Sequence, residues 1–229
     1  MALTLATART RIRFRIGETT PSFWTEAELN SYINDAKDDL YNAILTINKD
    51  FFEKRVTLAT TVGDITGIEL PADFQQVKSI RFTTPGYEDT VFNPQDRGTQ
   101  AFIMGLNSLS ISNSPYEMMY DVYQNLDDSG KTWYLQLSPI TRSILAIELN
   151  YVSQLPDLSS DSDTFGFMAP FEGYILDAAT YYALSKGPSG DYQNYASRSE
   201  AKLNRILANA SRQNKMGTEI TQGFLEDSF

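Results

Sequence analysis

The stretch Trp24–Ile47, WTEAELNSYINDAKDDLYNAILTI, carries the clearest helical pattern in the sequence. Thr25 and Glu28 have the spacing of a capping box, in which the side chain of each residue accepts a hydrogen bond from the backbone amide of the other. Trp24 and Leu29 have the spacing of the hydrophobic staple that accompanies such a box. We therefore predict a long amphipathic helix that ends near Asn48. Its apolar face consists of Leu29, Ile33, Ala36, Leu40, Ile44 and Ile47.

A cluster of four arginines precedes this helix in residues 9–17, RTRIRFRIG. Basic and apolar residues alternate there, as they do in a strand, but a helical pattern includes more of the apolar residues. Thr4 is a suitable N-cap and Gly17 a suitable stop, so we predict a first helix between them. Its apolar stripe consists of Leu5, Ala8, Ile12 and Ile16.

The pattern changes from Arg55 to Gln154, where short β-branched segments alternate with proline, aspartate and glycine. This alternation is typical of strands joined by turns. Asn93 and Pro94 resemble an N-cap followed by proline at the first helical position, which predicts a short helix to about Met104. The predicted strands are 56–61, 68–70, 77–83, 117–124, 132–137 and 144–152, the last three as an antiparallel meander.

An acidic, serine-rich segment at 155–164, LPDLSSDSDT, separates this region from two further helices. Its aspartates lack the central glycine and the terminal glutamate of a calcium loop, so we predict a solvated linker. Apolar periodicity places the two helices at 171–185 and 191–215. The last residues, 217–229, contain two glycines and no periodicity, which predicts a flexible, extended tail.

Together these elements predict an α+β fold, in which the N-terminal and C-terminal helix pairs form one four-helix bundle. Each helix pair has an apolar face that requires a partner, and the other pair is the one available. The predicted domains are the first helix pair in 1–54, an antiparallel β-rich insert in 55–154, the second helix pair in 155–216 and the tail in 217–229.

The composition argues against catalysis. The chain has no histidine and no cysteine, so it lacks the usual general base, the thiolate nucleophile and the commonest metal ligand. We predict no enzymatic activity, no cofactor and no metal site, with a cell-wall hydrolase that uses two carboxylates as the catalytic alternative. The sequence has no apolar run of about 18 residues and no signal peptide, which predicts a cytosolic protein without membrane contact.

Three interpretations of the arginine cluster remain open at this stage. Arg9, Arg11, Arg13 and Arg15 either flank a surface helix without a special role, dock on an acidic protein surface, or contact nucleic acid. A DNA-binding module has the weakest support of the three, because the chain has ten net negative charges and no aromatic residues interleave with the arginines as in known binding motifs.

Five segments give the chain a resemblance to a known family. They are TLATARTRIRFRIGE at 4–18, SFWTEAELNSYINDA at 22–36, IELPADFQQVKSI at 68–80, LQLSPI at 135–140 and IELNYVSQLPDLSSDSD at 147–163, followed by a helix rich in tyrosine and alanine. In their order and spacing they resemble the tailed-phage head–tail adaptors of the SU10 type. The resemblance covers nearly the whole chain.

This resemblance implies a structural virion protein. Such adaptors form a ring, typically of twelve subunits, beneath the portal at the neck of the virion, after assembly in the host cytoplasm. The ring joins the capsid to a tail, nozzle or tube protein and encloses the channel through which genomic DNA passes without sequence-specific contact. The C-terminal tail commonly reaches the portal, which would make Phe224, Leu225 and Phe229 portal anchors. The arginine cluster would then contact a neighbouring subunit or a partner.

Overall fold

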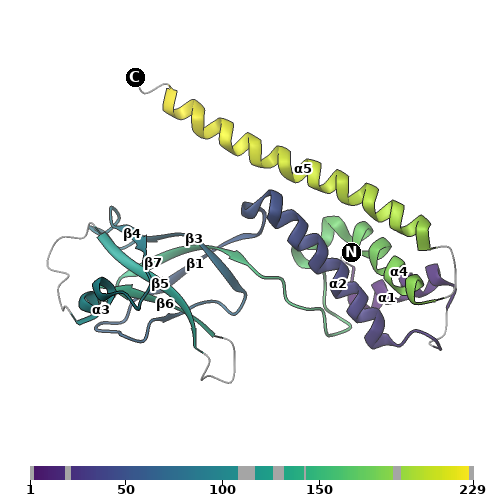
Figure 1. Cartoon of the computed structure of the whole chain (residues 1–229), viewed down its shortest axis with the longest axis horizontal. Coiled ribbons are helices and arrows are strands. Elements are labelled where there is room, and N and C mark those ends of the chain that lie inside the picture. The colour runs from purple at the N-terminus through teal and green to yellow at the C-terminus, as the bar shows by residue number, and fades with distance from the viewer. Residues whose placement is uncertain are drawn as a thin grey trace. The chain divides into compact units, whose positions relative to one another are not determined.

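The computed structural model of the chain describes residues 3–18, 22–107, 117–125, 132–141, 143–187 and 192–226. The chain divides into two compact units, Met1–Phe52 with Leu155–Phe229, and Glu53–Gln154. Among the described residues, the first unit, here called the helical unit, contains four α-helices, and the second, the β unit, contains two sheets and a short helix (Figure 1). The fold class is therefore α+β, as predicted.

The first two helices begin and end at the residues that their sequences indicate. Helix α1 spans Leu5–Ile16, with the Thr4 side chain accepting a hydrogen bond from the Thr7 amide and Gly17 in the left-handed region at φ 75°. Helix α2 spans Glu26–Ile47, and both hydrogen bonds of the Thr25–Glu28 capping box are present. These contacts satisfy backbone groups that the helix itself leaves without partners.

Helix α4 (Glu172–Lys186) lies at the centre of the helical unit and packs against α1, α2 and α5. It is buried around most of its circumference, which is typical of a helix surrounded by others. The 3₁₀ turns Lys49–Phe52 and Gly166–Phe171 follow α2 and precede α4. All four helices of the predicted bundle thus pack together through α4, while the regular four-helix bundle geometry stays a prediction. The buried residues of α4 are Tyr174, Ile175, Leu176, Asp177, Ala178, Ala179, Thr180, Ala183 and Leu184.

Helix α5 spans Tyr192–Glu226 and therefore includes most of the predicted tail. The prediction of an extended segment from Gly217 is wrong as far as Glu226. A glycine costs only about 1 kcal/mol in a helix, and elongation of an existing helix avoids the cost of nucleation. Phe224 and Leu225 consequently lie in the last turn of α5, and Phe229 lies outside the described residues.

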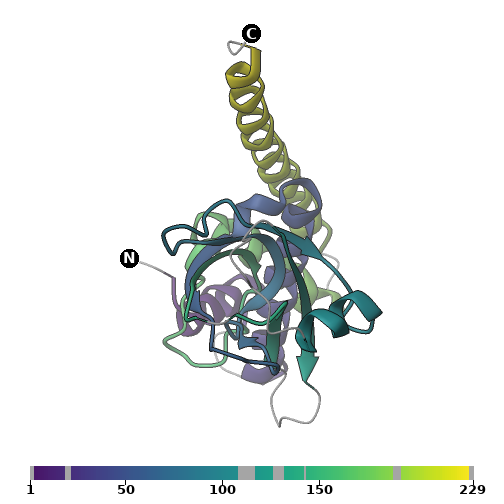
Figure 2. The same ribbon diagram turned by 90° about the vertical axis from the view of Figure 1, so that its left-hand side faces the viewer.

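The β unit contains one sheet with the strand order β1-β7-β3 and a second with the order β2-β6-β5-β4. Side chains from both sheets meet in a single apolar core, and Figure 2 shows the strands from a second direction. The short helix α3 (Gln100–Asn107) packs against β6. The strands are β1 Glu53–Ala59, β2 Ile68–Glu69, β3 Phe74–Phe82, β4 Val91–Pro94, β5 Glu117–Asn125, β6 Thr132–Ser138 and β7 Ala146–Ser153.

Two predictions in this region are wrong. Asn93 and Pro94 do not begin a helix but end β4, which pairs in parallel with β5 at the edge of its sheet. Proline is tolerated there because an edge strand leaves one row of amides without a ladder partner. The predicted meander is correct for the antiparallel pair β5–β6, but β7 leaves it and pairs with β1 and β3. Buried residues on both faces of β7 suit it to this central position.

Candidate partner-binding surfaces

Three of the four clustered arginines form ion pairs within the helical unit. Arg9 contacts Asp161 and donates a hydrogen bond to Asn30 at 3.2 Å. The Arg13 guanidinium lies 2.8 Å from the Glu18 carboxylate and also donates to the Trp24 carbonyl at 2.9 Å. These contacts attach α1 to the start of α2 and to the segment before α4. The prediction that this cluster meets another subunit or a partner remains untested.

Glu18 is the acceptor that connects the end of α1 to the residues just before α2. Besides Arg13, its carboxylate accepts hydrogen bonds from the backbone amides of Ser22 and Phe23 and from the Ser22 hydroxyl. Burial by itself would raise the pKa of Glu18, but the hydrogen bonds from Phe23 and Ser22 outweigh burial and lower the pKa to about 2. The charged form of this carboxyl is therefore the one that the fold stabilises.

We expect Glu18→Gln to destabilise the helical unit at pH 7 and to lose this effect in acid. The folded pKa lies below the value of about 4.3 typical of an unfolded chain, so the carboxylate contributes stability above that pH. This contribution declines as the pH falls through the folded value of about 2. Urea unfolding of both proteins between pH 7 and pH 2 measures it, with Glu200→Gln on the exposed surface of α5 as control. A difference independent of pH would contradict the assignment.

Arg15 belongs to a second charge cluster, centred on the fully buried Asp177 of α4. Its guanidinium donates to one carboxylate oxygen at 2.9 Å, and Lys202 of α5 donates to the other at 2.6 Å. Arg198 lies 3.7 Å from that second oxygen. One carboxylate therefore links α1, α4 and α5, and three cations surround it.

Arg11 differs from the other three arginines. It is exposed and forms no ion pair with any residue that the structure describes. Phe14, one turn further along α1, is 81 % exposed, the largest exposed fraction among the large apolar residues of the described chain. The outer face of α1 therefore presents an arginine and an aromatic ring side by side, and both residue types are enriched at protein interfaces.

The acidic segment 155–164 is mostly exposed, as a solvated linker is, but it also packs on α1 and α2 through its backbone and the buried Leu158. Asn34 exchanges two hydrogen bonds with the backbone of Leu158, at 2.9 and 3.1 Å. Lys37, whose side chain is 2 % exposed, donates to the Pro156 carbonyl at 2.7 Å and contacts Asp157 at 3.2 Å. A buried ammonium needs such partners, and the segment supplies them as the Pro156 carbonyl and the Asp157 carboxylate.

A groove of about 410 Å³ lies between α2 and α4 on the surface of the helical unit. Asp39 accepts a hydrogen bond from the Tyr182 hydroxyl at 2.5 Å, and burial together with this carboxylate raises the pKa of Tyr182. Lys186, at one end of the groove, forms an ion pair with Glu28. The residues that line the groove are Tyr32, Asp35, Asp39, Tyr182, Ser185 and Lys186.

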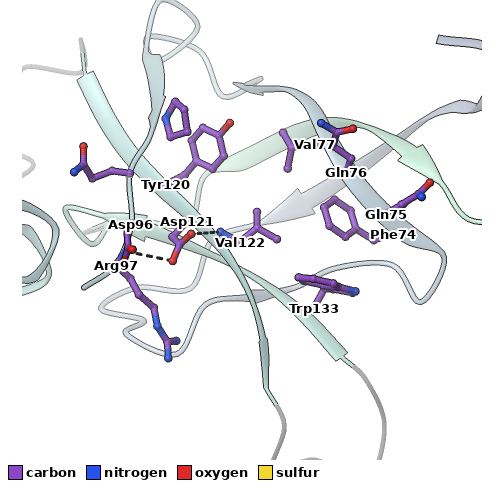
Figure 3. Close-up of a pocket in the computed structure, with 12 residues that line it drawn as sticks. Phe74, Gln75, Gln76, Val77, Asp96, Arg97, Tyr120, Asp121, Val122 and Trp133 are labelled. Atoms are coloured by element: carbon purple, nitrogen blue, oxygen red, sulfur yellow. Dashed lines mark hydrogen bonds between the residues drawn. The ribbon is translucent and has the colours of Figure 1, made fainter. Parts of the chain in front are cut away.

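The β unit has a larger open cavity of about 710 Å³ between the edge strand β3 and the end of β4 (Figure 3). Trp133 and Phe74 point into the same space as Tyr120 in that view. This cavity could not be predicted from the sequence, because only the pairing of distant strands brings its walls together. The remaining lining residues are Gln75, Gln76, Val77, Pro94, Gln95, Asp96, Arg97, Asp121 and Val122.

This cavity contains two carboxylates, which a hydrolase of the glycosidase type would require. Both are engaged with the backbone: Asp121 accepts from the amides of Arg97 at 3.2 Å and Val122 at 2.8 Å, and Asp96 accepts from Gly98 at 2.7 Å. These contacts give both carboxylates a structural role, Asp96 within the turn after β4 and Asp121 between β5 and that turn. Aromatic rings beside amide side chains suit the binding of a polar or peptide ligand.

Among the described residues, no group of three or more acidic side chains is arranged to hold a metal ion. Within the same residues, no helix has both the length and the apolar character needed to cross a lipid bilayer.

Comparison with known proteins agrees with the resemblance noted in the sequence. No curated protein matches the chain directly. The family described as SU10 adaptor protein matches residues 3–222, a range that includes parts of both units. Its members have a structural role in the phage particle and connect portal and tail components at the head–tail junction. The chain therefore belongs to the SU10 adaptor family and is a phage head–tail adaptor of the SU10 type.

Proposed function

We propose that copies of this chain form a closed ring, of twelve subunits by analogy with the family, directly beneath the portal. The ring joins the capsid to the tail or nozzle protein and encloses the channel through which the DNA leaves. The observation that carries this proposal is the family match over residues 3–222. Assembly takes place in the host cytoplasm, and the mature ring is part of the virion neck.

The charge distribution supports a channel that does not retain DNA. The chain has ten net negative charges, and a protein surface binds DNA by placing several cations on its phosphates. Arg9, Arg13 and Arg15 are already paired with carboxylates of the helical unit. A DNA-binding module built on this cluster would have only Arg11 without an ion pair among the described residues.

The ion-pair clusters also support a rigid ring subunit. Asp177 connects α1, α4 and α5, while Lys37 connects α2 to the segment before α4. Each cluster therefore ties together elements that are far apart in the sequence. A subunit of a closed ring must keep its contact surfaces in a fixed relation, because small angular errors accumulate around the ring.

We assign portal binding to the C-terminal end, with Phe224, Leu225 and Phe229 as the anchors. Deletion of 217–229 is expected to leave the helical unit folded, because the buried contacts described here precede this segment. Binding of the full-length and shortened chains to the portal of the same phage is measured by co-sedimentation. The full chain should bind and the shortened chain should lose at least about 90 % of its binding, a tenfold change that corresponds to about 1.4 kcal/mol.

A chain in which Phe224, Leu225 and Phe229 are replaced by alanine should show the same loss. The matched control replaces Thr218, Thr221 and Gln222 by alanine, and it should bind like the original chain. Unimpaired binding by the shortened chain would show that the anchors lie elsewhere. Failure of the full chain to bind the portal would overturn the proposed function itself.

A further inference from the structure

The outer face of α1 is an exposed surface built from Thr7, Thr10, Arg11 and Phe14, here called the Arg11 face. All four residues are exposed, whereas Leu5, Ala8 and Ile12 on the opposite side of the helix are fully buried. An exposed phenylalanine beside an arginine without an ion pair in the described chain combines an apolar anchor with a charged group. This combination is typical of the centre of a protein interface.

The groove between α2 and α4, here called the Asp35 groove, has the complementary chemistry. The positive charge of Lys186 at its end is balanced by Glu28, so the carboxylates of Asp35 and Asp39 leave the groove acidic. Asp35 is exposed and has no ion pair among the described residues. The rings of Tyr32 and Tyr182 line the same groove, and tyrosine faces attract guanidinium groups.

The Asp35 groove and the docked acidic segment lie on different edges of α2. Asn34 and Lys37 contact residues 156–158, while Asp35 and Asp39 line the groove beside α4. The carboxylates of the groove are therefore separate from those that neutralise the arginines on the inner side of α1. The Arg11 face and the Asp35 groove are thus two distinct patches of one unit. Two different complementary patches produce a head-to-tail contact, and such contacts form a ring when the rotation from one subunit to the next closes on itself.

We infer that the Arg11 face of one subunit docks in the Asp35 groove of the next subunit. Arg11 places its guanidinium against Asp35 and Asp39, and Phe14 covers the aromatic wall of the groove. This inference rests on the proposed ring and names the contact that would hold it together. A single arginine and an aromatic ring fit a small acidic groove better than they fit DNA, which requires several cations.

Charge reversal on each side tests the contact. Arg11→Glu and Asp35→Lys each place like charges opposite each other at every interface of the ring. Like-charge contacts at an interface cost several kcal/mol, so each variant alone should associate at least about tenfold more weakly. Ring formation by the full chain on the portal is measured by native mass spectrometry. Asp89→Lys in the β unit, with the same charge change at an exposed site, should assemble normally.

The decisive experiment uses an equal mixture of the two variants. In an alternating ring the new carboxylate of each Arg11→Glu subunit meets the new ammonium of an Asp35→Lys subunit. At every other interface the original Arg11 meets the original Asp35, so assembly should return with equal numbers of the two subunits. A chain that carries both changes should also assemble alone.

Two additional measurements keep the test independent of misfolding. Circular dichroism checks that each variant is folded. Arg11→Ala only shortens an exposed side chain and introduces no opposite charge. It should also weaken assembly, as Arg11→Glu does.

The outcomes separate this contact from the ring itself. If Arg11→Glu and Asp35→Lys each assemble normally, the inferred contact is wrong. The contact is also wrong if both variants fold but their mixture does not assemble. Neither result contradicts the proposed ring. Loss of DNA or portal binding by Arg11→Glu, with the ring intact, would assign Arg11 to that partner and would also overturn the contact. Absence of a ring with the original chain on the portal would overturn the proposed function and the contact with it.

Discussion

Replacing Asp177 by alanine is expected to lower the free energy of unfolding of the helical unit by about 3–5 kcal/mol. Asp177 is 0 % exposed, and its carboxylate is the counterion of Arg15, Lys202 and Arg198. Without it, three cations from α1 and α5 remain close together with no compensating charge. Urea unfolding of the full chain, followed by circular dichroism at 222 nm, which reports mainly on helices, measures the change.

Two further variants separate charge from packing at this site. Asp177→Asn keeps the shape of the side chain but removes the charge that the three cations require. We therefore expect Asp177→Asn to lower the free energy of unfolding almost as much as Asp177→Ala does. Arg198→Ala is the control, because the Arg198 side chain is 58 % exposed and solvent weakens the pair; it should cost less than about 1 kcal/mol. An effect of Asp177→Ala within about 0.5 kcal/mol of zero would contradict the role of this cluster.

Lys37→Ala is expected to cost about 2–4 kcal/mol and to release the segment 155–164 from α2. The variant removes a fully buried aliphatic stem and the donor of the hydrogen bond to the Pro156 carbonyl. Denaturant unfolding measures the energy, and limited proteolysis measures the exposure of the segment. Cleavage within 155–164 should become faster than in the original chain.

Lys37→Met keeps most of the buried volume but not the donor, so it should recover the packing part of this loss. Lys49→Ala, on an exposed part of the turn after α2, is the matched control and should lie within about 0.5 kcal/mol of the original chain. If Lys37→Ala leaves both stability and proteolysis unchanged, the docked position of the segment is wrong.

The features predicted correctly from the sequence depend on neighbouring residues. The caps at Thr4, Gly17 and Thr25 are made by hydrogen bonds across a few residues, so the residue types and spacing were sufficient. The partner of a strand lies far away in the sequence. For this reason the pairing of β7 with β1 and β3, and of β4 with β5, could not be derived from local patterns.

The buried charges could not be predicted for a related reason. Periodicity arguments assign charged residues to the solvent side, but Lys37, Asp177 and Arg13 are buried, each beside a partner from another element. The docking of the acidic segment could not be predicted because its partners on α1 and α2 lie about 120 to 160 residues earlier in the chain. The Asp35 groove and the cavity beside Trp133 also need contacts between distant elements.

The arginine cluster shows most clearly what could not be decided from the sequence. The sequence left three roles open for it, and in the structure Arg9, Arg13 and Arg15 pair with carboxylates of the helical unit. Only the helical arrangement reveals that Arg11 and Phe14 share the outer face of α1. The distinction between these roles depends on which side of α1 each residue occupies.

Cryo-electron microscopy of the neck of the virion that contains this chain tests the central claim most directly. The account predicts a closed ring of twelve copies directly beneath the portal, around an open DNA channel, with the C-terminal end of α5 against the portal. Absence of the chain from the neck would contradict this prediction. Separate copies bound there without contact between neighbours would contradict it as well.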